Sequence, residues 1–418
     1  MTSSDAKPTD SPAVDVVDDA EPKVPSAKMG EFYAFLRNLR SFTGDLSALT
    51  CPSFLLSGDS VLEYCTHWGD QPALFTAIGK AQSSEDRMVA VCRWFISTLY
   101  GSYYARVAIS NEKKPFNPIL GEQLLGTWTN TGGHGVNRLV CEQVSHHPPV
   151  SAVYLENEEA GIMLNGHAGQ KSKFTGTTIK VEQTGFVTLH LKACDEVYTL
   201  TYPDLYIRSL ITGRPFMEIV GSSWIQSNKG YSTVFKYIGK PWFGGEYHRF
   251  KGHIYEHTKR PHMDPEKLTR ALPGVHSLYK IEGRWMAQSQ IIKEHAKTTE
   301  TLFDATEHQP IPMEVVPIEE QGHLESRRVW KSVADAINQG DFGTASACKT
   351  EIEERQRALR KDREEKNETW TPNYFTFVPR DRLPTDSLSH LDPKTQVEGG
   401  RWVYKDIVDK ITTKSDET

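Results

Sequence analysis

Residues Glu142–Pro149 read EQVSHHPP and join the end of a strand-like run to a rigid corner. The run Asn137–Gln143 comes first, and two prolines follow His146 and His147 directly. Each proline lacks an N–H and fixes φ, so the strand ladder must stop there. Two imidazoles on a stiff corner can both donate hydrogen bonds. We interpret them as a phosphate site rather than a metal site, because neighbouring residues on extended chain point in opposite directions.

The sequence on both sides of this corner has a strand pattern. Short alternating runs, many of them separated by turns with Gly, Asn or Asp, fill residues 120–309. The expected strands are Leu124–Thr129, Arg138–Gln143, Ser151–Leu155, Ile162–Gly166, Thr177–Glu182, Phe186–Leu191, Val197–Thr201, Phe216–Val220, Tyr231–Tyr237, His248–Tyr255 and His276–Ile281. This pattern predicts an antiparallel meander, closed or nearly closed, in a mainly β fold with flanking helices. Its own side chains cannot fill so wide a barrel, so we expect an internal cavity.

The regions before the barrel change character twice. Residues 1–28 carry six acidic and three basic residues, four prolines and no aromatic side chain, a composition typical of disorder. Residues 29–57 begin with a helical pattern, Met29–Phe42, which is either a helix packed on the core or a mobile lid. Its apolar residues are Phe32, Phe35, Leu36, Leu39 and Phe42. Residues 58–119 are expected to be helical; Ser84–Tyr104 is apolar nearly all round and should be buried, with Ser83 and Asp86 as a capping box.

After the barrel, residues 310–418 are expected to form a helical subdomain and a polar tail, with helices at Leu324–Ile337 and Thr344–Lys366. The second helix is highly charged, and Lys349, Glu353 and Arg357 follow one another at intervals of four, so they share one face. This face is either solvated and stabilised by ion pairs, or part of a binding site in which Glu353 orients both cations.

Composition excludes several classes of protein. The 418 residues are 38% hydrophobic and 24% charged, with a net charge of −6 and a pI near 6.2, so the basic field of a nucleic-acid-binding protein is absent. The six cysteines form no CxxC pair, which favours reduced cytosolic thiols over zinc or a disulfide framework. We find neither a secretory signal nor a run of 18 apolar residues, so we expect no membrane-spanning segment.

Three separate segments could together bind a phosphorylated ligand. The turn KKPFNPILGE (Lys113–Glu122) could present Lys114 and Asn117, although alone it could be an ordinary basic turn. His146 and His147 alone could be buried structural histidines. With the charged helix they would offer cations, imidazoles and an amide, and charge-assisted hydrogen bonds to phosphate contribute roughly 1.5–3 kcal/mol each.

These segments resemble motifs of the oxysterol-binding-protein-related family, particularly its short yeast-type members. The resemblance includes SFTGDLSAL (Ser41–Leu49), RWFISTL (Arg93–Leu99) and HLESRRVW (His323–Trp330), and extends over Gly30–Thr371. It implies a large incomplete antiparallel β-barrel around a hydrophobic tunnel, with an N-terminal helical lid and a C-terminal helical region. Residues 29–386 would form one lipid-binding domain. The residues implied at the headgroup of phosphatidylinositol 4-phosphate are Lys114, Asn117, His146, His147, Lys349, Glu353 and Arg357.

The same resemblance implies the cargo and the setting. A cytoplasmic, monomeric carrier would exchange sterol for the phosphoinositide, touching organelle membranes such as the Golgi or the endoplasmic reticulum, with no cofactor, metal or nucleic acid. The residues implied near the sterol hydroxyl are Trp68, Ser102, Tyr103 and Gln183. A phosphatidylserine-carrying branch resembles LPTFILE where this chain has CPSFLLS (Cys51–Ser57), and the missing glutamate favours sterol. The alternatives are a phosphoinositide sensor without net transport and a carrier of another lipid such as phosphatidylserine.

Other signals are weaker. Thr301–Glu307, TLFDATE, resembles a receptor-docking FFAT motif, but family members carry a similar stretch inside the fold. His253 and His257 could face one way on a strand, without a carboxylate or cysteine pattern that would favour a metal. The sequence has no Cys-x₅-Arg, G-x-S-x-G, P-loop or G-x-G-x-x-G, so we predict a protein that is not an enzyme.

Overall fold

The computed structural model describes residues 28–42, 46, 49, 51–105, 113–210, 216–240, 245–258, 265–268, 275–379 and 399–412. The segment 1–27, predicted to be disordered, lies outside the described residues. No helix within these ranges is long and apolar enough to cross a membrane.

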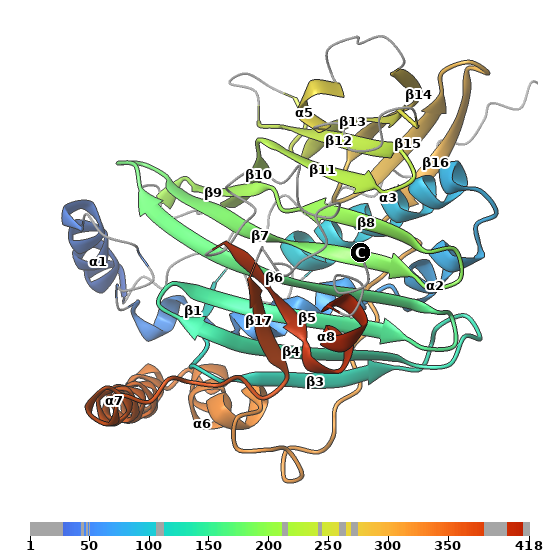
Figure 1. The fold of residues 1–418 in the computed structure, drawn as a ribbon. Helices are drawn as coiled ribbons and strands as arrows, with labels where there is room; N and C mark the ends of the chain where they lie inside the picture. The colour runs from blue at the N-terminus through green and yellow to red at the C-terminus, as the bar shows by residue number, and fades with distance from the viewer. Residues whose placement is uncertain are drawn as a thin grey trace, which may run out of the picture.

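A fourteen-stranded sheet dominates the described chain (Figure 1). Its strands are β3 (Gln123–Trp128), β4 (Asn137–His146), β5 (Pro149–Asn157), β6 (Ile162–Phe174), β7 (Ile179–Leu191), β8 (Glu196–Thr201), β9 (Asp204–Arg208), β10 (Phe216–Val220), β11 (Ser222–Ser227), β12 (Tyr231–Ile238), β13 (Arg249–Glu256), β14 (His276–Arg284), β15 (Gln288–Lys293) and β16 (Thr298–Asp304). They pair antiparallel in the order β16-β15-β14-β13-β12-β11-β8-β7-β6-β5-β4-β3, and β9 joins β7 to β10. Because β3 and β16 do not pair with each other, the barrel is incomplete, and the predicted antiparallel meander is confirmed.

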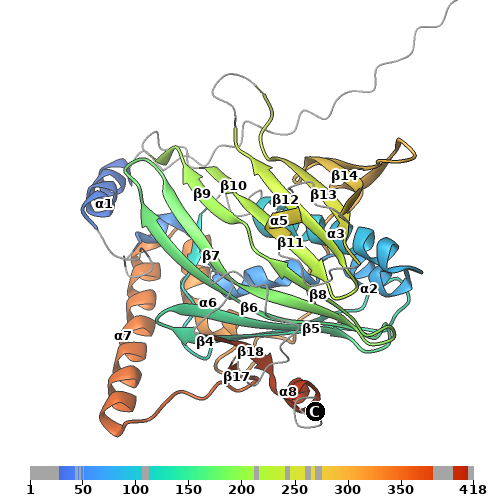
Figure 2. The ribbon, with the colours of Figure 1, turned by 45° about the horizontal axis from the view of Figure 1, so that its top comes forward.

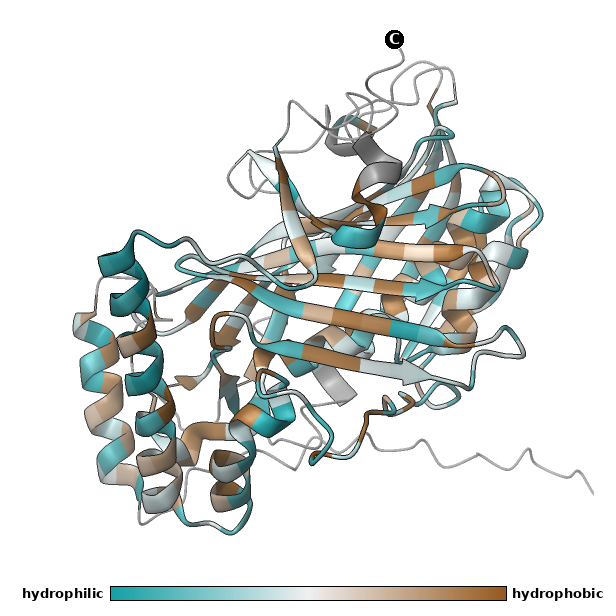
Figure 3. Ribbon diagram, turned by 60° about the horizontal axis from the view of Figure 1, so that its bottom comes forward, coloured by the Kyte–Doolittle hydropathy of each residue, from teal (hydrophilic) through white to brown (hydrophobic). Residues whose placement is uncertain are grey.

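The strand predictions were too short and too few. Thr177–Glu182 and Phe186–Leu191 belong to one strand, β7, which passes through Gly185 at φ +96° without ending. Glycine adopts this conformation without a steric penalty, and a Cβ there would lie 2.3 Å from the carbonyl oxygen of His167. Strands β9, β11, β15 and β16 were missed; β15 and β16 are rich in polar residues, so alternation alone does not mark them. In Figure 3 short hydrophobic and hydrophilic stretches alternate along many strands.

The helices lie around and inside this sheet. They are α1 (Met29–Ser41), α2 (Pro72–Lys80), α3 (Ser84–Tyr100), α5 (Pro265–Leu268), α6 (Ser326–Asn338), α7 (Phe342–Lys366) and α8 (Lys405–Thr412), with 3-10 segments η3 (Ser53–Leu55) and η4 (Val61–Trp68) and a π-helical turn η5 (Gly101–Ala105). The small pairs are β1 (Leu56–Ser60) with β2 (Lys114–Phe116), parallel, and β17 (Phe375–Pro379) with β18 (Gly400–Tyr404), antiparallel. The C-terminal region predicted as helical therefore also contains two strands.

The largest hydrophobic cluster forms around α3. Trp94, Phe95 and Ile96 are fully or almost fully buried, and Phe95 stacks on Phe235 of β12 at 5.5 Å between ring centroids. The predicted capping box is present, because the Ser83 hydroxyl accepts from the Asp86 N–H and donates to its carboxylate. The helix that the sequence predicted to be buried thus occupies part of the interior of the barrel.

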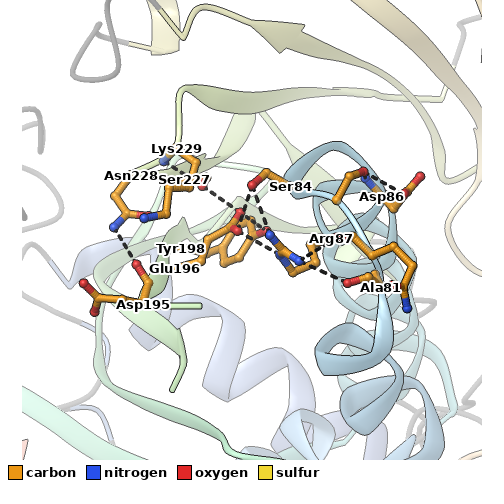
Figure 4. A network of polar contacts seen from close by, with 12 residues as sticks. Ala81, Ser84, Asp86, Arg87, Asp195, Glu196, Tyr198, Ser227, Asn228 and Lys229 are labelled. Atoms are coloured by element: carbon orange, nitrogen blue, oxygen red, sulfur yellow. Dashed lines mark hydrogen bonds and ion pairs between the residues drawn. The ribbon is translucent and has the colours of Figure 1, made fainter. Parts of the chain in front are cut away.

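A buried ion pair attaches α3 to the sheet (Figure 4). Arg87 Nε donates to Glu196 Oε2 at 2.8 Å, and the Glu196 side chain is fully buried. Glu196 also accepts from Ser84, Tyr198 and Ser227, which completes its hydrogen bonding. Such a network is stable only while every partner is present.

Buried carboxylates also attach the C-terminal elements. Glu122, at the start of β3, accepts hydrogen bonds from Ser326 and Trp330 of α6, and burial raises the pKa of its carboxyl. Glu142 of β4 accepts from the N–H groups of Asn373 and Tyr374, just before β17. Strands β17 and β18, which we call the C-terminal strand pair, then lie with α8 on the outer face of the barrel (Figures 1 and 2).

We predict that Arg87→Met lowers the free energy of unfolding by about 3–5 kcal/mol, since it leaves the buried Glu196 carboxylate without its counter-charge. Equilibrium urea unfolding measures this. Lys192→Met is the matched control, because Lys192 pairs with Glu156 at 2.9 Å on the surface and should contribute no more than about 1 kcal/mol. Equal losses in the two variants would show that the buried Arg87–Glu196 pair contributes no more than a surface pair.

Candidate functional site

Helix α7 presents the charged face that the sequence predicted. The helix begins after Asp341, whose side chain accepts from the Thr344 N–H, and ends at Asn367, which is left-handed at φ 54°. Between these ends it makes one uninterrupted run of 25 residues. A regular helix of this length keeps residues at intervals of four in one line.

Glu353 lies between two cations on that face. Its Oε1 accepts a hydrogen bond from Lys349 Nζ, and its Oε2 is 3.5 Å from Arg357 Nη2. The Lys349 side chain is only 13% exposed, whereas that of Arg357 is 62% exposed. Lys349 therefore has an almost fixed position, and Arg357 has room to move toward a ligand.

Strand β2 brings a third cation to this face. Lys114 Nζ donates to Asn117 Oδ1 at 2.9 Å, so the Pro-Phe-Asn turn does hold these two side chains together. Burial lowers the pKa of Lys114, the Cys51 thiol raises it, Lys349 lowers it and Glu353 raises it. Phe116 of the same strand shares a hydrophobic cluster with Ala345 of α7, so Lys114 lies near this helix.

The two histidines occupy the end of β4 and the turn that follows it. His146 Nδ1 donates to the carbonyl of Pro118 at 3.0 Å, and the two imidazole centroids are 4.6 Å apart with planes at 68°. Our expectation that the side chains point in opposite directions was wrong. The β4–β5 register shifts between Gln143 and Ser145, so the chain is no longer regularly extended there.

The histidine corner faces α7. Burial lowers the pKa of His146, and the neighbouring His147 lowers it further. The hydrogen bond to the Pro118 carbonyl raises this pKa, but by less. Arg360 lowers this pKa further, while Glu353 raises it. The structure thus brings Lys114, Asn117, His146, Lys349 and Glu353 into one cluster, with His147 and Arg357 exposed at its edge.

Sequence reasoning missed Arg360. It lies seven residues after Glu353 and three after Arg357, so the same helical periodicity that selected those two also predicts it. Its Nε is 3.6 Å from Glu364 Oε1, an exposed ion pair of little strength. Arg360 can therefore turn toward an anion at small cost.

The cluster has an excess of positive charge. With Lys114, Lys349 and Arg357 protonated, Glu353 balances only one of the three charges. A phosphate monoester carries about −1.5 to −2 at pH 7, which matches the remaining charge. The arrangement can therefore bind a phosphorylated headgroup by charge-assisted hydrogen bonds.

A second polar cluster lies beside η5. Gln183 Nε2 donates to the Tyr103 hydroxyl at 2.8 Å and to the Pro203 carbonyl at 2.6 Å. Burial raises the pKa of Tyr103 to about 12, with hydrogen bonds to Gln183 and Ser102 opposing the rise. The structure thus brings together three of the four residues that the resemblance implied near a sterol.

Trp68, the fourth, packs nearby against Tyr202, with ring centroids 6.0 Å apart. The Tyr202 hydroxyl is buried and has no hydrogen-bond partner among the described residues. Burial raises the pKa of this phenol, and Tyr103 is one of the groups that raise it further, so the two rings are close. Sequence reasoning missed Tyr202, because nothing in its local pattern shows that its hydroxyl lacks a partner.

Helix α1 forms at the predicted place, with Phe32 and Leu39 buried and Phe35, Leu36 and Phe42 half-buried. Phe35 packs against the cluster that contains Trp330 of α6, and so does Ile352 of α7. Figures 1 and 2 place α1 and α7 at the same end of the barrel. The role of α1 as a lid remains a prediction.

The weaker signals have structural explanations. Leu302 and Phe303 of the FFAT-like stretch are 1% exposed, so the apolar residues of this stretch belong to the core. His257 bonds to Ser232, and His253 lies near Ser277 and Glu294. Within the described ranges, no group of three or more His, Cys, Asp or Glu could hold a metal ion.

Comparison with known proteins identifies the family. The oxysterol-binding protein model matches residues 34–335 and 333–409. The chain belongs to the oxysterol-binding protein family. Protein kes1 of Schizosaccharomyces pombe is 37% identical over 390 residues, which cover 92% of this chain and 96% of that protein. Protein KES1 of Mycosarcoma maydis is 41% identical, over 81% of this chain and 86% of that protein.

Solved structures support the fold. The Osh1 ORD domain in complex with cholesterol superposes with a TM-score of 0.68 at 21% identity, over 88% of this chain and 85% of that one. The Osh3 ORD from Saccharomyces cerevisiae in complex with PI(4)P gives 0.63 at 21% identity, over 86% and 91%. Both are similar to this chain in architecture.

We predict that a phosphate monoester binds this site more tightly as pH falls from 7.5 to 6.5. The pKa of His146 lies below its usual value in the free protein, and a bound dianion must raise it, so binding takes up a proton. Calorimetric titration with inositol 1,4-bisphosphate should show a severalfold change, at most about tenfold per pH unit.

His146→Asn keeps a donor but cannot titrate. Its binding should depend less on pH than that of the parent protein, while the titration of the ligand's own phosphate, whose second pKa is about 6, remains. The same pH dependence in both proteins would show that His146 does not gain a proton on binding.

Proposed function

We propose that this protein exchanges sterol for phosphatidylinositol 4-phosphate between membranes and makes no covalent change to either lipid. The observation that carries the proposal is the cationic cluster at the α7 end of the barrel. Segments remote in sequence supply Lys114, His146 and Lys349 to one place there, around a single carboxylate.

The two lipids need different parts of the protein. The cationic cluster would bind the inositol phosphate, and the barrel interior would hold the hydrocarbon. Each CH₂ removed from water contributes about 0.8 kcal/mol, so a carrier must enclose the apolar part to move a lipid through the cytoplasm. One of the two solved relatives is in complex with cholesterol and the other with PI(4)P, so proteins of this architecture bind both classes of lipid.

In this mechanism the side chains only bind, orient and exclude water. Lys114, Lys349 and Arg357 would neutralise the phosphate, with Glu353 positioning the last two before the lipid arrives. Helix α1 would close over the acyl chains, and Ser102, Tyr103, Gln183 and Trp68 would surround the sterol hydroxyl. Because both lipids would use one interior, one must leave before the other enters, and a phosphoinositide gradient could drive sterol transport.

We predict that replacing both His146 and His147 with alanine abolishes phosphoinositide extraction from liposomes and spares sterol extraction. The imidazoles belong to the headgroup cluster at the end of β4, whereas Gln183 lies on β7, three strands further along the sheet. Fluorescent sterol and phosphoinositide transfer assays measure the two activities separately. Equal loss of both would refute this division, and phosphoinositide binding without sterol movement in the parent protein would indicate a sensor.

We predict that Tyr202→Phe weakens sterol binding by roughly three- to tenfold, the equivalent of one hydrogen bond. The free energy of unfolding should stay within about 0.5 kcal/mol, because this hydroxyl has no partner among the described residues. Phosphoinositide extraction serves as the internal control. Unchanged sterol affinity would exclude the Tyr202 hydroxyl from the sterol site.

A further inference from the structure

The outer face of β6 carries a second polar junction, away from both lipid clusters. Asn165 Nδ2 donates to the carbonyl of Trp402 at 2.9 Å, and Asn165 Oδ1 accepts from the N–H of Tyr404 at 2.8 Å. Tyr404 also stacks on Tyr154 of β5, with centroids 4.1 Å apart and an angle of 8°. These contacts fix the register of β18 on the barrel wall.

His167 and Arg401 come next along the same two strands. His167 lies two residues beyond Asn165 and so on the same face of β6, where Phe186 of β7 packs against its ring at 5.3 Å. Arg401 precedes Trp402 on β18. His167 is fully buried and Arg401 is 6% exposed, so both are enclosed between the barrel and the C-terminal strand pair.

Neither side chain has a polar partner among the residues that the structure describes. Both ring nitrogens of His167 and Nε of Arg401 are buried without a hydrogen bond, and no ion pair of Arg401 exists in the described part of the chain. Buried polar groups are almost always hydrogen-bonded, and an uncompensated buried charge is strongly destabilising. Two such groups side by side indicate that something else satisfies them.

The charge at this junction defines what that partner must be. Burial lowers the pKa of His167 to about 3, and the nearby guanidinium of Arg401 lowers it too, so the imidazole is neutral at pH 7. Burial also lowers the pKa of Arg401, to about 10, which leaves it charged. One negative charge therefore balances the junction, and the enclosure favours a small ion.

We propose that His167 and Arg401 form an anion site between β6 and β18 that binds a small, singly charged inorganic anion such as chloride. The guanidinium offers N–H donors and the imidazole offers one more. A bound ion would neutralise Arg401 and hold the C-terminal strand pair on the barrel. This site is independent of the lipid exchange proposed above.

Urea unfolding of the full chain tests the site. An anion that binds only the folded protein stabilises it by RT ln(1 + [L]/Kd). Chloride replaces isethionate at constant ionic strength, so that the bulk salt effect stays constant. Above the dissociation constant, the unfolding equilibrium constant should fall by up to tenfold for each tenfold rise in chloride.

Two variants make this result specific. Arg401→Met should lose the chloride dependence, whereas Arg355→Met, which removes an exposed arginine of α7, should keep it. If Arg401→Met fails to fold, crystals of the parent protein grown in bromide should show an anomalous peak within hydrogen-bond distance of Arg401 and His167. Absence of chloride dependence in the parent protein, equal dependence in Arg401→Met, or ordered water alone at the junction would overturn the proposal.

Discussion

A helix that is apolar on nearly every side needs protein around it on every side, and in this chain the curved sheet encloses α3. The burial of Trp94, Phe95 and Ile96 removes large apolar surfaces from water, which is the main favourable contribution to folding. The Arg87–Glu196 ion pair fixes the orientation of α3 relative to β8. The incomplete closure of the sheet, with β3 and β16 as its edges, follows from wrapping around helices.

Hydrogen bonds to buried carboxylates hold the C-terminal elements on the barrel. Glu122 receives donors from α6, and Glu142 receives the N–H groups that precede β17. Both glutamates lie at the end of the β3–β4 hairpin that also carries His146. The same hairpin therefore positions the imidazoles and orients α6, from which α7 follows. In this way a few buried hydrogen bonds bring the cations of α7 to the histidine corner.

The separation of charge from hydrocarbon follows from the same geometry. Positive groups gather where α7 lies near the end of β4, and the exposure of Arg357 there lowers the cost of keeping it charged. The interior instead contains phenols, an amide and a hydroxyl, of which Tyr202 has no partner among the described residues. Neutral polar groups suit a sterol hydroxyl, because burial of a charge beside the hydrocarbon would cost far more.

The sequence by itself determined features that depend on neighbours along the chain: the capped, buried helix at Ser84, the corner at His146, the cationic line of α7 and the antiparallel meander. Periodicity reports which side of its own element a residue occupies, and sequence reasoning could have extended that line to Arg360. Only the tertiary structure decided that Lys114 lies near Glu353, that β7 is continuous, and that His167 and Arg401 are enclosed without partners among the described residues. These contacts join elements that are distant in the sequence, so they depend on how the whole chain packs.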